Sequence, residues 1–250
     1  MDGVLPHTPI ETRDKQMPQR PPPDTLRIAT YNIQKCVGLD LRRRPERILQ
    51  VLAGLKADVA VLQEADKRLP PRPAALPHFL VEETGWRAAD LGGAGSLGWH
   101  GNAVLYRNGV QLRAKGHIAL PGLEPRGAVW AELETALGPV RVIGAHLGLT
   151  GRARREQMHA LARAAKRDDA AVVLAGDFNE WSRGAVLEHI APALNFLPPK
   201  PSFPALRPLG ALDRIAHCKR LTAVAHGVHG KRPAHIASDH LPVWADLRAV

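Results

Sequence analysis

The chain has 250 residues, of which 45 % are hydrophobic, so it can form one large domain or two small ones around a sizeable core. Its 34 lysines and arginines outnumber 24 aspartates and glutamates, and the formal charge of +10 would attract phosphate-bearing partners or merely keep the protein in solution. The two cysteines, Cys36 and Cys218, are too few for a disulfide framework or a zinc site, and they fit a reducing compartment.

The first 24 residues are rich in proline and carry charged residues between the prolines. No apolar run there has the length of a secretory signal, so we interpret residues 1–24 as a flexible tail and residues 25–250 as one domain. No later stretch approaches the length of a membrane span. We therefore expect a monomer located in the cytoplasm.

The first half of the domain predicts three strands and one helix. A strand over residues 26–33 precedes a helix that opens at Pro45, a residue suited to a first helical turn. The helix places four apolar side chains on one face: Ile48, Leu49, Leu52 and Leu55. Further strands are expected at residues 59–63 and 103–106. Residues 69–101 between them are rich in proline and glycine, and we expect a long loop with one short element.

The second half predicts five more strands, at residues 128–133, 140–145, 171–175, 215–217 and 241–247. A helix between the second and third of these strands carries Met158, Leu161, Ala162 and Ala165 on one face. Its other faces hold Arg152, Arg154, Arg155 and Arg163. Paired strands with only occasional helices favour an α/β sandwich of mainly antiparallel character over a doubly wound sheet.

Polar residues stand at the ends of most of these strands. Five of them follow a predicted strand: Asn32, Glu64, His146, Asp177 and Asn179. Three others precede one: Asp213, Asp239 and His240. If the last two strands run antiparallel to the others, all these side chains gather at one rim of the sheets.

Such a set suits the attack of water on phosphorus. A hard cation needs oxygen ligands, which Glu64 and the Asn32 amide offer. The phosphoryl oxygens need hydrogen-bond donors, and His146, Asn179 and His240 are the donors available. Asp177 is placed to orient or deprotonate the water. Asp213 beside His240 would hold that imidazole in one tautomer and favour its charged form.

Each residue also has an ordinary interpretation. Asn32 after a strand is more often a turn former, Glu64 a surface carboxylate and His146 a solvated or core histidine. Residues 176–179 would equally form a tight Asx turn, and residues 238–242 a strand start with a proline stop. Because all these ordinary interpretations would have to hold together and in chain order, we reject them as a joint explanation.

The motifs that carry these residues resemble the endonuclease/exonuclease/phosphatase superfamily, which includes pancreatic deoxyribonuclease, apurinic endonucleases, sphingomyelinases and inositol-polyphosphate 5-phosphatases. The resemblance covers residues 26–247, and the chain is most similar to small bacterial members of the superfamily. Its motifs are TYNIQ at residues 30–34, LQE at 62–64, GNAVL at 101–105, HL at 146–147, GDFN at 176–179, LDRI at 212–215 and SDHLP at 238–242.

The resemblance implies a four-layer α/β sandwich, in which two packed mixed sheets are flanked by helices and the site lies at one end. It implies Mg²⁺ or Mn²⁺ on Glu64, with Asn32 and Asp239 near the metal. Asp177 would align the water, while the phosphoryl group would be contacted by His146, by Asn179 and by His240, oriented by Asp213. Whether Asp177 or His240 accepts the proton stays open. The candidates for substrate contact are Asn102, Arg126, Trp99 and Phe203, with Trp181 and His100 near the expected rim.

Departures from the family's patterns narrow the function. Gln34 stands where apurinic endonucleases carry an aspartate, and His146 where they favour a tyrosine. Neither an export signal nor an apolar membrane-facing hairpin of secreted sphingomyelinases is visible. We expect a metal-dependent phosphoric ester hydrolase, namely a phosphodiesterase with nuclease-like chemistry, whose net charge favours nucleic acid.

Two alternatives remain at this point. One is an enzyme for a phospholipid headgroup or a small phosphorylated metabolite. The other is a non-catalytic RNA-binding regulator, although the chain retains the residues such a protein would have lost. The arginines at 152, 154, 155 and 163 would favour nucleic acid if they contact a phosphate backbone, but they are equally compatible with a solvated helix surface.

Overall fold

The computed structural model describes residues 22, 24–66, 73–93, 95–122, 126–167, 169–182 and 185–250. The expected flexible tail over residues 1–24 therefore lies outside the described residues, apart from Pro22 and Asp24. Within the described ranges, no helix has the length and apolar character needed to cross a lipid bilayer.

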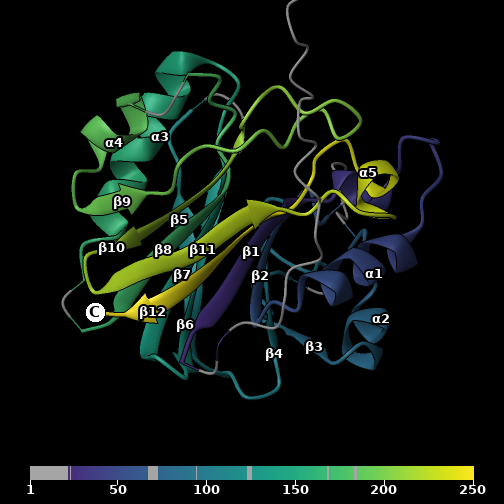
Figure 1. The fold of residues 1–250 in the computed structure, drawn as a ribbon, viewed down its shortest axis with the longest axis horizontal. Helices are drawn as coiled ribbons and strands as arrows, with labels where there is room; N and C mark the ends of the chain where they lie inside the picture. Colours follow the sequence, from purple (N-terminus) through teal and green to yellow (C-terminus); the bar gives the residue numbers. More distant parts are fainter. Residues whose placement is uncertain are drawn as a thin grey trace, which may run out of the picture.

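Two six-stranded sheets pack face to face (Figure 1). The first sheet has the order β11 (Leu221–Val228), β12 (Val243–Ala249), β1 (Leu26–Asn32), β2 (Val59–Gln63), β4 (Ala103–Arg107) and β3 (Trp86–Ala88). The second has the order β5 (Gln111–Ala119), β6 (Gly127–Thr135), β7 (Gly138–His146), β8 (Ala171–Asp177), β10 (Asp213–Cys218) and β9 (Leu194–Phe196). Each sheet contains one parallel pair, β1 with β2 and β7 with β8, and its other pairs are antiparallel.

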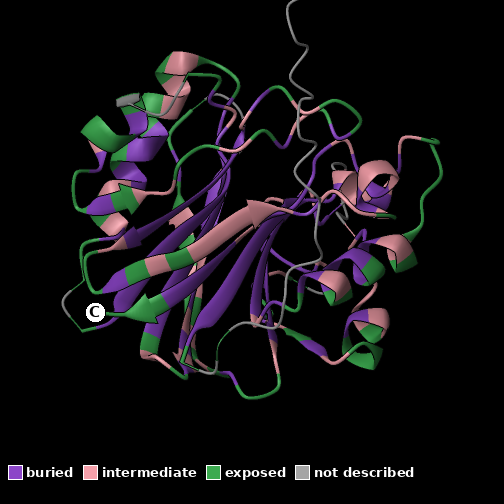
Figure 2. Ribbon diagram, in the orientation of Figure 1, coloured by how far each residue is buried: buried purple, intermediate pink, exposed green. Residues whose placement is uncertain are grey.

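Helices cover the outer faces of the two sheets. Along the first sheet lie η1 (Gln34–Cys36), α1 (Pro45–Leu55), α2 (His78–Glu83) and α5 (Ala234–Ala237); the second is covered by α3 (Gly151–Ala164) and α4 (Ala185–Ile190). One apolar cluster fills the space between the sheets, and one lies under each helical layer. The strands form the buried centre of the molecule (Figure 2). The expected four-layer α/β sandwich is confirmed.

Both predicted helices form, and the apolar face of each is largely buried. Pro45 occupies the first turn of α1, and the face formed by Ile48, Leu49, Leu52 and Leu55 is buried. Helix α3 begins after Thr150, whose hydroxyl accepts a hydrogen bond from the Ala153 N–H at 3.3 Å. Its face is buried at Met158, Leu161 and Ala165, while Ala162 is half-buried.

Some elements differ from the expectation. The expected loop at 69–101 contains both α2 and β3. Strands β5 and β11, at sheet edges, were not predicted, because their polar residues interrupt any apolar run. The last strand begins at Val243 rather than at residue 241, since Pro242 has no N–H to give to the ladder.

The strand directions bring the expected rim together. Strand β10 runs antiparallel to β8, with Asp213 opposite Asp177. Strand β12 runs antiparallel to β1, with Val243 opposite Thr30. The parallel pair of β7 and β8 puts His146 beside Asp177. The strand ends therefore meet at one end of the sandwich.

Candidate active site

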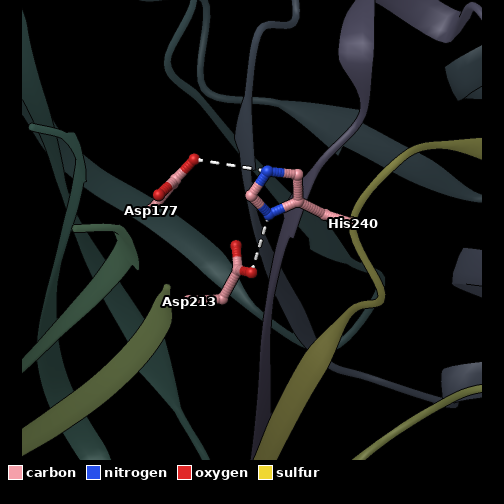
Figure 3. Close-up of side chains that lie close together, drawn as sticks. All are labelled: Asp177, Asp213 and His240. Atoms are coloured by element: carbon pink, nitrogen blue, oxygen red, sulfur yellow. Dashed lines mark hydrogen bonds and ion pairs between the residues drawn. The ribbon is translucent and has the colours of Figure 1, made fainter. Parts of the chain in front are cut away.

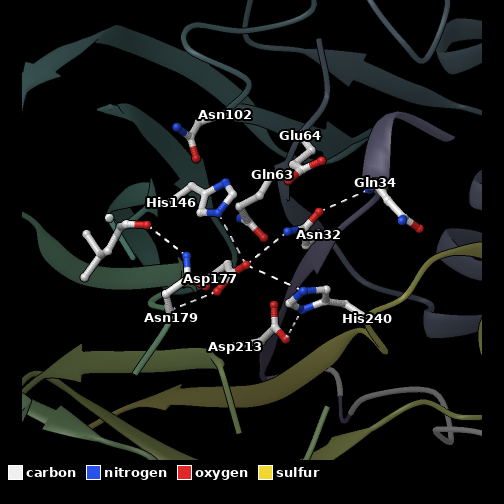
Figure 4. Close-up of polar contacts among 12 residues, drawn as sticks. Asn32, Gln34, Gln63, Glu64, Asn102, His146, Asp177, Asn179, Asp213 and His240 are labelled. Carbon is white, nitrogen blue, oxygen red and sulfur yellow. Dashed lines mark hydrogen bonds and ion pairs between the residues drawn. The ribbon is translucent and has the colours of Figure 1, made fainter. Parts of the chain in front are cut away.

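Asp177 is the centre of the polar rim (Figure 4). One oxygen, Oδ2, accepts a hydrogen bond from Asn32 Nδ2 at 3.0 Å and lies 3.5 Å from His146 Nε2 and 3.7 Å from His240 Nε2. The other oxygen, Oδ1, accepts from the backbone N–H of Asn179 at 3.0 Å. Donors thus surround a buried carboxylate and fix its orientation.

Local backbone geometry places this carboxylate. A Cβ atom at Gly176 would lie 1.9 Å from the carbonyl oxygen of Ala145, so only glycine permits this approach of the two strands. Asn179 follows with φ of +50°, in the left-handed region, and its Nδ2 donates to the carbonyl oxygen of Leu147 at 2.9 Å. The turn at residues 176–179 therefore does form, and it serves to aim Asp177 into the rim.

His240 lies between two carboxylates (Figure 3). Its Nδ1 is 2.9 Å from Asp213 Oδ2, and its Nε2 faces Asp177. The Ser202 hydroxyl donates to the same Asp213 oxygen at 2.5 Å. All three members of this chain of contacts, Ser202, Asp213 and His240, are buried. The pairing of Asp213 with His240 that the sequence suggested is present in the structure.

The two histidines of the rim have opposite electrostatic settings. Burial lowers the pKa of His146 from its ordinary value of 6.5 to about 4, and Asp177 offsets only part of that effect. Burial also disfavours the charged form of His240, but Asp213, Asp177 and Asp239 outweigh it and raise the pKa to about 9. At neutral pH, His146 is a neutral imidazole and His240 an imidazolium.

Glu64, Asn32 and Gln34 form a second group beside Asp177 (Figure 4). Glu64 has φ of +53°, a strained conformation of the kind found at functional sites. The Asn32 Oδ1 accepts from the Gln34 N–H at 3.1 Å, and Gln34 Oε1 accepts from the Asp239 N–H at 3.1 Å. Burial raises the pKa of Asp239, and the nearby charge of Glu64 raises it further.

The oxygen atoms of this second group suit a hard divalent cation. The Lys35 ammonium contacts Glu64 Oε2, so a positive charge already stabilises that carboxylate. Among the described residues, a different group (Asp177, Asp213 and His240) has possible ligand atoms within 4.8 Å of one another. Its histidine is already held between two carboxylates, which favours a hydrogen-bonded chain there. A metal site on Glu64, Asn32 and Asp239 stays a prediction.

The predicted substrate contacts occupy different settings. Asn102 is buried, donates from Nδ2 to the Gly127 carbonyl at 2.9 Å, and leaves its Oδ1 without a hydrogen-bond partner. Arg126 lies close enough to His146 to lower its pKa. Trp99 stacks on His117, with ring centroids 4.5 Å apart, and covers Gly127. Phe203 packs against the His240 ring at 4.8 Å. Substrate contact by all four stays a prediction.

Sequence reasoning missed two members of the rim. Ser202 carries no motif and reaches Asp213 from an irregular loop, so no spacing signal identified it. Lys35 follows the first motif, and its approach to Glu64 depends on three successive residues, Gln34, Lys35 and Cys36, with positive φ. Of these three residues, Gln34 alone belongs to a sequence motif, where it departs from the pattern of the apurinic endonucleases.

Known structures share this fold. D. rerio TDP2 complexed with a single-strand DNA product has a TM-score of 0.72 and 16 % identity, with 90 % of this chain and 99 % of that chain covered. A mannosyl-6-phosphatase of Bacteroides thetaiotaomicron VPI-5482 has a TM-score of 0.68 and 18 % identity, covering 89 % and 97 %. These similarities establish the fold alone.

Sequence comparison is more specific. The uncharacterized protein YbhP of Escherichia coli (strain K12) is 27 % identical over 254 residues, covering 92 % of this chain and 99 % of YbhP. The Endonuclease/Exonuclease/phosphatase family matches residues 29–240, a range that includes all eight polar residues at the strand ends. With the sandwich and the polar rim in place, the chain belongs to the Endonuclease/Exonuclease/phosphatase family.

Proposed function

We propose that this protein is a Mg²⁺- or Mn²⁺-dependent phosphodiesterase that directs a water molecule in line at phosphorus, with nuclease-like chemistry. Membership of the family supports phosphoric ester hydrolysis as the reaction class. The observation that carries the proposal is the Asp177 carboxylate, held by Asn32 and Asn179 between two histidines of different charge.

The hydrogen-bond geometry supports a division of roles. Both ring nitrogens of His240 face carboxylate oxygens, and only an imidazolium offers an N–H to each. It then has no lone pair with which to accept a proton, so the role of orienting and deprotonating the water goes to Asp177. His240 donates to the phosphoryl oxygens as negative charge develops on them, while Asp213 keeps the ring in position.

His146 and Asn179 complete the set of donors. His146 is neutral and donates from one ring nitrogen only, so it contributes orientation rather than charge. One N–H of the Asn179 amide is bound to Leu147, which fixes the side chain and leaves the second N–H for a phosphoryl oxygen. These two groups face the same carboxylate region as His240, so the donors converge on one reacting centre.

Glu64, with Asn32 and Asp239, would hold the metal ion. A divalent cation there would supply positive charge to the phosphoryl oxygens. Lys35 would compete with such an ion, because both cations use the same carboxylate. Asn102, Arg126, Trp99 and Phe203 are proposed to contact the remainder of the substrate.

Metal-dependent hydrolysis of bis-p-nitrophenyl phosphate tests this function. We expect turnover with Mg²⁺ or Mn²⁺ and none in excess EDTA. Glu64→Gln should raise the metal concentration needed for half-maximal rate about tenfold or more, since the site loses a formal charge. Glu156→Gln makes the same change on the exposed face of α3 and should leave the metal dependence unaltered.

Two results would contradict the proposal. Full turnover in EDTA would remove the metal from the reaction. An unchanged metal dependence in Glu64→Gln would remove this carboxylate from the metal site.

A further inference from the structure

Exposed apolar side chains are concentrated at the active-site end of the molecule. In the described part of the chain, nine large apolar side chains are exposed, and five of these lie in loops of the rim. Four belong to loops of the second sheet that adjoin site residues, and we call them the apolar collar: Leu149 (64 % exposed), Trp181 (63 %), Leu206 (70 %) and Leu209 (69 %). Scattered exposed leucines need no explanation, but a group beside a site does.

The loops that carry the collar are joined to one another. Arg154 donates to the Leu149 carbonyl oxygen at 2.7 Å and pairs with Glu180 at 3.2 Å, which links the first loop to the second. The Trp181 ring lies over Gly210, where a Cβ atom would approach it to 2.9 Å, and its centroid is 6.1 Å from that of Phe203. The loops that carry the collar are therefore linked to one another, and the exposed Trp181 ring packs on a neighbouring loop.

The loop with Leu206 and Leu209 is also attached to the site itself. Its Ala205 N–H donates to the Asp239 carbonyl oxygen at 2.7 Å. Ser202, just before the loop, contacts Asp213 and accepts at its carbonyl oxygen from the Leu241 N–H at 2.8 Å. In Figure 1 the segment between β9 and β10 runs along the end of the sandwich where the strands of the site finish. Whatever binds the collar is held next to the reacting centre.

Positive charge accompanies this apolar surface. Arg155 and Arg207 are exposed, and neither has an ion-pair partner within the described residues. The neighbouring acids are already neutralised, Glu180 by Arg154 and Glu156 by Arg152. The surface therefore combines apolar side chains with uncompensated arginines.

The loop between η1 and α1 adds a similar pair of features. Leu41 is 87 % exposed and is followed by the exposed residues Arg42 and Arg43. This loop is tied to the segment before His240, because the Leu39 N–H donates to the Ile236 carbonyl oxygen at 3.0 Å. Apolar and positive residues thus also occur beside α5, which leads into the site.

This combination fits an anionic lipid surface better than other partners. Leucine and tryptophan enter the interfacial region of a bilayer, and arginine is attracted to anionic headgroups. Nucleic acid would favour stacking platforms, whereas three of the four collar residues are leucines without a π face. A second copy of this chain would bring a like-charged surface against this one.

We propose that the apolar collar docks the protein on an anionic lipid surface. The consequence for catalysis rests on the proposed function: the substrate is the phosphodiester of an anionic lipid headgroup, presented at the rim. Anchoring by a few side chains is reversible, so the protein would exchange between the surface and solution.

Vesicle sedimentation in EDTA tests docking without catalysis. Wild-type protein should sediment with phosphatidylcholine vesicles that contain phosphatidylglycerol, and much less with phosphatidylcholine alone. Leu206→Ser combined with Leu209→Ser should weaken binding at least about tenfold, since binding scales with inserted apolar area. Phe79→Ser is the matched control, because Phe79 is 60 % exposed on α2, away from the collar. Both variants should hydrolyse bis-p-nitrophenyl phosphate within about twofold of wild type, because neither change touches the reacting centre.

Several outcomes would overturn docking. Docking would be overturned if the wild-type protein did not bind anionic vesicles, or if the leucine variant bound them as well as wild type. A loss of single-stranded oligonucleotide binding in the variant without a loss of vesicle binding would assign the collar to nucleic acid. Conversion of a dimer to a monomer by the same change would assign it to a second copy.

Measurements of turnover on lipid and on soluble substrates then distinguish the docking proposal from the proposed function. Hydrolysis of phosphatidylglycerol in vesicles, faster than that of soluble glycerophosphoglycerol and slowed by the leucine changes, would support the lipid substrate. Equal rates on both would show that the free headgroup is sufficient and would overturn it. Hydrolysis of the soluble nitrophenyl diester without any lipid hydrolysis would overturn the lipid substrate and leave the proposed chemistry intact. Vesicle binding without hydrolysis of any diester would overturn the proposed chemistry and leave docking intact.

Discussion

The polar rim has two halves that differ in burial and in freedom to exchange partners. The closed half consists of His146, Asp177, Asp213 and His240, all buried and joined around Asp177 and His240, and the buried Asn32 links it to the open half through hydrogen bonds with Asp177 and Gln34. The open half consists of Gln34, Lys35, Glu64 and Asp239, which are half-buried. In this half, the Glu64 carboxylate is held by the flexible Lys35 ammonium group instead of a fixed donor.

This difference has a chemical meaning. Groups that stabilise a transition state act best when their positions are fixed beforehand and water is excluded, as in the closed half. A site that takes up an ion from solution needs access and a ligand that can change partner, as in the open half. We expect changes in the closed half to alter the rate, and changes in the open half to alter the metal dependence.

The largest expected effect lies in the closed half. Asp177→Asn and His240→Ala should each reduce the turnover of bis-p-nitrophenyl phosphate about 10²–10⁴-fold, because water alignment and charge stabilisation are transition-state terms. The metal concentration for half-maximal rate should stay within a few-fold of wild type, a range set by experimental scatter and small indirect effects. The double variant should be far less impaired than the product of the singles, because the groups act as a unit. Either single variant retaining wild-type turnover would break the assignment.

An intermediate effect concerns the charge of His240. Burial lowers the pKa of His240, and Asp213 makes the largest contribution in the opposite direction. Asp213→Asn removes that contribution, so the pKa of His240 should fall from about 9 to its ordinary 6.5 or below. Because the pKa of His240 is higher in the folded protein, the charged imidazolium stabilises the fold. This stabilisation is complete below pH 6.5 and is lost as the pH rises through about 9. Asp213→Asn should therefore lower the melting temperature more at pH 6 than at pH 10.

NMR titration of the metal-free protein measures this pKa directly. His229 provides an internal control, since burial and Lys231 lower its pKa and Asp213 is not among the causes. A His240 resonance that still titrates near pH 9 in Asp213→Asn would contradict the role given to this pair.

The smallest expected effect lies in the open half. Lys35→Met removes the ammonium that competes for Glu64, so a few-fold lower metal concentration should suffice for half-maximal rate. Lys115→Met breaks an exposed pair with Asp90, away from the rim, and should change nothing. If Lys35→Met instead raised the metal requirement, Lys35 would be supporting the metal site and the distinction between the halves would fail.

Much of the fold was predictable from local patterns. The apolar runs of β1, β2, β4, β7 and β8 identified central strands because both faces of these strands are buried. The faces of α1 and α3 followed from helical spacing. Edge strands such as β5 were missed, since one face meets solvent and its polar residues obscure the pattern.

The sequence by itself identified eight residues of the polar rim, because each of these groups stands beside a strand that its apolar pattern predicts. Tertiary structure decided what these groups do to one another. Burial and neighbouring charges separate the pKa values of His146 and His240, and no sequence spacing contains that information. The support of Asp213 by Ser202 and the assembly of the apolar collar were likewise decided by folding, because irregular loops meet through long-range contacts that have no sequence period.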